Sequence, residues 1–200
     1  MDYEFIEWYK LRLDIRADLL TVVEGVRRGA NIELWKIGKH ESQKLFASQK
    51  KLLEFCLNKL GLLFRIHNDD YYVSRSRLWL DKLWKREIKT GEFLGYPKCC
   101  IAGFEAGCKA VMEVGNNDKA PAIRYFRELE TLINDEDFDM TVLYNQHVPC
   151  RLDCRKALKI AQKNRAVLEA HDVEAANYLR DDNLNLVYQF AYKYPKRETR

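Results

Sequence analysis

Four of the six cysteines lie in two short stretches whose composition suits metal or thiol chemistry. The first stretch, Gly-Tyr-Pro-Lys-Cys-Cys, carries Cys99 and Cys100, and the second, His-Val-Pro-Cys-Arg-Leu-Asp-Cys, carries Cys150 and Cys154. Each contains a proline shortly before its cysteines, where a helix commonly begins. Unpaired backbone N–H groups and the helix dipole stabilise a thiolate there, the form that binds metals or attacks as a nucleophile. We therefore predict a metal or iron–sulfur site built from these four residues.

The spacing of the cysteines refines this prediction. Cys150 and Cys154 are four residues apart, so on a helix they would share one face, roughly 5–6 Å apart at Cβ. Cys99 and Cys100 are adjacent, which fits a structural zinc site poorly, because such sites usually take cysteines two to four residues apart. The adjacent pair fits an iron–sulfur cluster better, because one of the two thiols can then stay free as a catalytic nucleophile. Cys99 is the candidate for this nucleophile.

Three further residues of the right type need an assignment. His147, three residues before Cys150, is predicted either to bind the metal and act as an acid or base, or to hydrogen-bond the helix start. Cys56 lies on an apolar helical stripe, and Cys108 lies two helical turns beyond Cys100, roughly 12 Å along a regular helix, so core packing is expected for both. Disulfide bonds and plain packing of the four site cysteines stay open as alternatives.

Two functions follow from these residues. The first is an iron–sulfur protein, with a [4Fe–4S]-type cluster that supports redox chemistry or activates sulfur or a substrate. The alternative is a non-enzymatic module in which a closed zinc site joins two helices and the protein binds RNA or another protein. The expected partners are accordingly RNA or a redox partner protein, with no membrane.

The cysteine motifs must be positioned by a mainly helical α+β fold. Apolar residues at helical spacing predict helices over about 2–28, 41–60, 76–88, 97–114, 121–133 and 149–170. A hairpin is predicted over 62–74, with its turn at Asn68–Asp70, and short strands over 31–37, 140–144 and, at the C-terminus, 184–194. Residues 1–90 form a helical region with the hairpin and residues 91–200 the cysteine-motif region, expected within one compact domain.

Composition narrows the function classes. The 200 residues carry a formal charge of +4, 32% are charged, and the basic residues are dispersed, so charge alone does not argue for nucleic acid. No apolar run approaches the ~20 residues that span a bilayer, and the N-terminus is acidic where a signal peptide is basic. A soluble cytoplasmic protein is expected, and in a reducing compartment six cysteines favour metal or redox chemistry over disulfides.

One other segment combines aromatic and basic residues. Its aromatic members are Tyr71, Tyr72, Trp79 and Trp84, and its basic members are Arg65, Arg75, Arg77, Lys82 and Lys85. Such a combination can form a stacking and phosphate-binding surface. An amphipathic hairpin and helix with ordinary core aromatics is the interpretation that the pattern favours.

The two cysteine stretches also resemble a known family. Leu-Gly-Tyr-Pro-Lys-Cys-Cys-Ile from Leu94, with Phe104 downstream, and the stretch from His147 to Cys154 resemble the mostly archaeal domain-of-unknown-function family numbered 483. The resemblance covers about residues 91–168. It implies a shared cysteine site at the four positions named above, with His147 in its motif, and it supplies no reaction.

Overall fold

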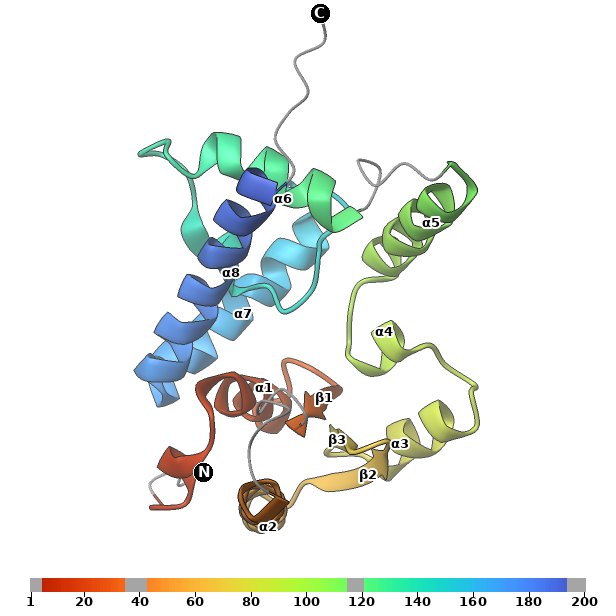
Figure 1. Ribbon diagram of the computed structural model, residues 1–200, viewed down its shortest axis with the longest axis vertical. Coiled ribbons are helices and arrows are strands. Elements are labelled where there is room, and N and C mark those ends of the chain that lie inside the picture. The colour runs from red at the N-terminus through yellow and green to blue at the C-terminus, as the bar shows by residue number, and fades with distance from the viewer. Residues whose placement is uncertain (1–4, 35–42, 115–120, 194–200) are drawn as a thin grey trace, which may run out of the picture. The chain divides into compact units, whose positions relative to one another are not determined.

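The computed structural model describes residues 5–34, 43–114 and 121–193. In order along the chain the elements are η1 (Trp8–Lys10), α1 (Leu13–Val23), β1 (Gly29–Glu33), α2 (Gln43–Lys59), β2 (Leu63–His67), β3 (Asp70–Ser74), α3 (Arg77–Trp84), α4 (Thr90–Phe93), α5 (Lys98–Val114), α6 (Pro121–Leu132), η4 (Met140–Tyr144), α7 (Arg155–His171) and α8 (Val173–Lys193) (Figure 1). The elements labelled η are 3-10 helices. The predicted α+β class with helices predominant is confirmed.

The chain divides into two compact units. Unit 1 contains residues 1–95 together with Val167–Ala175, and unit 2 contains residues 96–166 together with 176–200. The adjoining ends of α7 and α8 therefore belong to unit 1, and the rest of both helices belongs to unit 2.

Unit 1 contains a three-stranded antiparallel sheet in the order β1–β3–β2. Asn68 and Asp69 connect β2 to β3 with φ angles of 50° and 68°, a left-handed pair that tight hairpins require and that these residue types tolerate. The predicted hairpin over 62–74 is confirmed. The strand predicted over 31–37 is found in part as β1, which begins at Gly29 and ends at Glu33. Leu34 lies beyond the end of this strand, and residues 35–37 lie outside the described residues.

The first helix is shorter than its predicted range of 2–28. It begins at Leu13, after the separate 3-10 turn η1, and it ends at Val23. Gly25 follows with a φ angle of 72°, so a left-handed glycine stops the helix before the predicted end at residue 28.

Unit 2 has a core built by α6, η4 and α8, whose buried members include Phe126, Leu129, Leu143 and Val187. The strand predicted over 184–194 is wrong, because residues 173–193 form one continuous helix. Leu184 and Phe190 pack on the same core as Val187, which is helical spacing. The segment contains no glycine or proline to interrupt the helix; residue 194 lies outside the described residues.

The strand predicted over 140–144 is also wrong, since these residues form η4. The carboxylate of Asp139 accepts a hydrogen bond of 2.9 Å from the backbone N–H of Thr141. This short-range contact caps a helical turn and takes the place of strand pairing.

None of the helices in the described ranges is both long and apolar enough to cross a membrane.

Candidate metal centre

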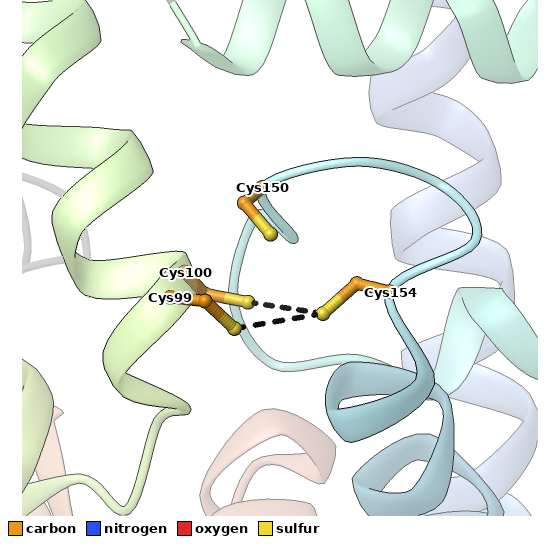
Figure 2. A group of neighbouring side chains, drawn as sticks. All are labelled: Cys99, Cys100, Cys150 and Cys154. Carbon is orange, nitrogen blue, oxygen red and sulfur yellow. Dashed lines mark hydrogen bonds between the residues drawn. The ribbon is translucent and has the colours of Figure 1, made fainter.

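Four cysteine side chains of unit 2 converge on one point, and we refer to them as the cysteine group. Its members are Cys99, Cys100, Cys150 and Cys154. All four Sγ atoms lie within 4.8 Å of one another. The Sγ of Cys154 is 3.8 Å from those of Cys99 and Cys100, as the dashed lines of Figure 2 show. Four sulfurs gathered this closely could hold a metal ion.

The start of α5 supplies two of these sulfurs. The carbonyl of Pro97 accepts hydrogen bonds from the backbone N–H groups of Cys100 and Ile101, at 2.9 and 3.0 Å. Pro97 therefore directly precedes α5, which begins at Lys98, within one residue of the prediction. Both cysteines lie in the first turn, where Cys99 is exposed and Cys100 is buried. Their side chains reach the same point although they are adjacent (Figure 2).

The other two sulfurs come from the chain before α7 and not from one helix face. The helix predicted to start at Pro149 starts at Arg155, so Cys150 stands in a loop and Cys154 at the N-cap position. The carbonyl of Cys154 accepts from the N–H of Leu158 at 2.9 Å. Its sulfur accepts from the N–H of Ala157, which caps the helix as a serine or aspartate side chain does elsewhere.

The sulfurs differ in how readily they lose a proton. Burial raises the pKa of Cys100 and of Cys150, although the backbone N–H of Cys150 donates to the sulfur of Cys100. For Cys154, burial opposes ionisation, but hydrogen bonds from Ala157 and from the neighbouring thiols outweigh it and lower the pKa. Of these three thiols, Cys154 at the helix N-terminus is the one whose pKa is lowered, and a bound cation would favour the ionised form of the buried thiols as well.

Gly103 is a supporting residue that the sequence reasoning did not identify. A Cβ atom at this position would lie 2.9 Å from the Cβ of Cys150, closer than such atoms normally approach. The glycine lets the loop that carries Cys150 approach the backbone of α5. A glycine inside a helix costs about 1 kcal/mol relative to alanine. The presence of a glycine within the predicted helix 97–114 was therefore the sequence signal for a close contact at this position.

His147 lies outside the cysteine group. Its ring stacks on Tyr96 with centroids 4.6 Å apart and an angle of 23° between the planes. The hydroxyl of Tyr96 donates to the carbonyl of Gln146 at 2.8 Å. These contacts fix the loop three residues before Cys150, and the role of His147 in binding or catalysis stays a prediction.

The remaining two cysteines differ from each other. Cys56 is fully buried, as predicted, and burial followed by the charge of Glu7 raises its pKa to about 12. Cys108 is only half-buried on α5. All six cysteines are free.

A cavity of about 500 Å³ adjoins Cys150 on the side of α6. Its walls include Phe104 of α5 and Arg124, Tyr125 and Glu128 of α6. Its volume lies in the range of small-molecule sites.

The fold and the site together define a mainly helical α+β protein with four cysteines placed to bind a metal. The chain belongs to the family described as "Protein of unknown function (DUF483)", which matches residues 70–181 and so includes the whole cysteine group. No curated protein and no solved structure matches the chain.

Proposed function

We propose that this protein binds one zinc ion through the cysteine group and that the ion's task is structural, in a non-enzymatic binding module. The observation that carries the proposal is the compactness of the four sulfurs. Zinc–sulfur bonds of ~2.3 Å in a tetrahedron place neighbouring sulfurs about 3.8 Å apart. Two of the sulfur–sulfur distances are 3.8 Å, and the rest stay within 4.8 Å.

The same distances favour a single ion over the iron–sulfur cluster that the adjacent cysteines suggested. In a cluster of four irons each thiolate binds a different iron, which spreads the sulfurs farther apart than sulfurs that share one ion. Zinc suits a four-thiolate tetrahedron because it is borderline soft, has no redox chemistry and imposes no other geometry.

A structural role is supported by the burial along α5. Cys100 is the one buried residue of this helix among those whose burial the structure describes. It forms a small buried cluster with Cys154 and Ala157. The start of α5 is thus held mainly through its cysteines, and an ion that binds them would join α5 to the start of α7.

The test is metal analysis of the full chain, purified without oxygen and without added chelator. We expect one zinc per chain and no colour, with cobalt substitution giving the visible bands of a tetrahedral thiolate site. Cys154→Ser should lose the zinc. Cys108→Ser, on the same α5 as two of the ligands, should keep it. Failure of zinc-supplemented, reduced protein to retain any metal would refute the proposal.

The second candidate is the iron–sulfur protein with redox or substrate-activating chemistry. It is favoured by the exposure of Cys99 and Cys150 and by the cavity beside Cys150. In this reading Cys99 is the nucleophile and His147 an acid or base near the loop. Iron together with acid-labile sulfide and broad visible absorbance in the same preparation would establish this candidate in place of the first.

A further inference from the structure

Unit 1 contains a second cavity, of about 270 Å³, that has no part in the cysteine group. It lies where the β2–β3 hairpin meets α3 and the segment that follows it. Its walls are His67, Tyr72, Leu83, Trp84, Arg86 and Thr90. Three of these six side chains are aromatic rings, and the volume suits one flat ring system better than a larger ligand.

Trp84 is the central aromatic residue of this cavity. Its ring makes T-shaped contacts with His67 at 6.2 Å and with Tyr72 at 6.1 Å between centroids. These contacts hold the indole in place, yet 40% of the residue remains exposed. A large aromatic side chain that is fixed and still open to solvent is a ready stacking surface.

Positive charge surrounds this surface. The guanidinium of Arg65 lies 5.2 Å from the centre of the Trp84 ring and pairs with Asp81. Arg86 is exposed at the edge of the cavity, and within the described ranges it makes no ion pair. Residues 65–90 carry seven lysines and arginines against four acidic residues.

The Asp81 carboxylate offsets the charge of Arg65, and the charge of Arg86 is not offset by an ion pair within the described ranges. Burial and then the charges of Asp70 and Glu33 raise the pKa of Tyr72, so both carboxylates lie near its hydroxyl. They would attract a cationic ligand, but Arg65 and Arg86 flank the indole and oppose one. Neither carboxylate lines the cavity, so the arginines set its preference, which is for an anionic ligand with a flat ring system.

The backbone places Arg86 at the cavity at a cost. Arg86 follows the end of α3 with a φ angle of 58°, and the N–H of Glu87 bonds back to the carbonyl of Lys82 at 2.9 Å. Helices that end in this motif usually have glycine at the left-handed position. An arginine at this left-handed position lowers local stability relative to glycine, and it places a cation beside the aromatic rings.

We propose that this cavity binds one base of a single-stranded nucleic acid, which stacks on Trp84 while Arg86 and Arg65 contact the flanking phosphates. The aromatic surface supplies the stacking energy and the arginines supply a salt-dependent attraction. A duplex does not fit, because its bases are stacked on one another and cannot enter the cavity. The proposal is independent of the zinc site, since every residue in it belongs to unit 1.

The test is fluorescence anisotropy of the full-length, metal-loaded protein with a labelled 12-nucleotide RNA of mixed sequence. The DNA of the same sequence and the RNA duplex of the same length serve as competitors. We expect binding that weakens with salt and prefers single strands. Trp84→Leu should weaken it about 5- to 150-fold, and Trp84→Phe should retain most of the affinity. Arg86→Gln should make the salt slope shallower by about 0.7, the contribution of one phosphate contact to a single strand.

The control is Tyr188→Leu, which removes an aromatic residue of unit 2 that is 50% exposed and should leave binding unchanged. If Trp84→Leu does not fold, the salt slope of Arg86→Gln carries the test, because this exposed substitution removes no packing. Absence of binding, equal affinity for the duplex, or binding that neither position affects would overturn the proposal. Loss of zinc on its own would not, and so the two proposals can fail separately.

Discussion

The two units of this protein are stabilised by different kinds of interaction. In unit 1, Arg16 and Asp172 form a buried ion pair in which each side chain is 3% exposed. Asp172 also accepts from the indole N–H of Trp8 and the backbone N–H of Ala175, both at 3.0 Å. In unit 2, the buried end of α5 meets the start of α7 through sulfur atoms.

The ion pair of unit 1 and the cysteine group of unit 2 differ in whether the chain itself supplies the counter-charge. Asp172 receives two hydrogen bonds of 2.6 Å from the guanidinium of Arg16, so this buried charge has its counter-charge and its donors within unit 1. The cysteine group instead brings four sulfurs together and has no cationic side chain among its members, so its thiolates would have no counter-charge within the group. Unit 1 should therefore be complete without an ion, and unit 2 should depend on one.

Metal removal is the strongest test of this contrast. A structural zinc ion contributes about 10 kcal/mol or more in isolated zinc-finger peptides, so chelation under reducing conditions should abolish the amide protection of the start of α5 and of residues 150–158. The sheet of unit 1 should stay protected. Hydrogen exchange read by mass spectrometry checks both regions in one sample, and equal loss of protection in β3 would contradict the contrast.

The converse test breaks the ion pair of unit 1. Asp172→Asn removes the buried counter-charge of Arg16 and leaves it only the exposed carboxylate of Glu174. Breaking a buried pair in this way typically costs about 3–5 kcal/mol, so the variant should have a lower melting temperature while zinc stoichiometry stays at its original value. Glu174→Gln is the matched control, because Glu174 also contacts Arg16, at 3.2 Å, but is 67% exposed. Its effect should stay within about 1 kcal/mol. A loss of zinc in Asp172→Asn would show that the units are not independent.

The fold was predictable where local signals and packing agree. Asn68 and Asp69 are turn residues between two β-prone runs, and the hairpin follows from them. The prediction of a strand from Leu184 was wrong because the apolar residues of this segment alternate, a pattern that fits a strand locally. The helical state of α8 is stabilised by Asp172 at its start and by packing on residues far away in the sequence, such as Phe126. The alternation of apolar residues predicts neither contact.

The site divides in the same way. Residue type and the proline before Cys99 were enough to predict that all four members of the cysteine group share one site. The geometry of the second stretch was not predictable, because Cys154 itself caps α7 and moves the start of the helix past Cys150. Gly103 was missed for a related reason, since its role depends on a loop about fifty residues away.

Gly103→Ala tests how closely the sulfur positions depend on the backbone. The new Cβ would force the loop of Cys150 away from α5, and overpacking of this kind costs about 1–3 kcal/mol. We expect weaker zinc binding in competition with a chromophoric chelator, although alanine favours the helix itself. Gly107→Ala, one turn farther along α5, gains the same helix propensity of up to about 1 kcal/mol. It should bind zinc at least as tightly, and an equal loss in both variants would place the effect outside the contact with Cys150.

The smallest expected effect lies in unit 1 and has the opposite sign. Arg86→Gly replaces a left-handed arginine by the residue that prefers this conformation, so the free energy of unfolding should rise by up to about 1 kcal/mol. Urea denaturation followed by tryptophan fluorescence measures this change, and Lys85→Gly, next to it at a C-cap with a φ angle of −78°, should destabilise instead. The same Arg86→Gly protein should bind the single-stranded probe less well, because it has lost the cation beside Trp84. A variant that is more stable and binds more weakly would show that Arg86 is retained for what it contacts and not for the fold, whereas a gain in stability with unchanged binding would remove Arg86 from the proposed site.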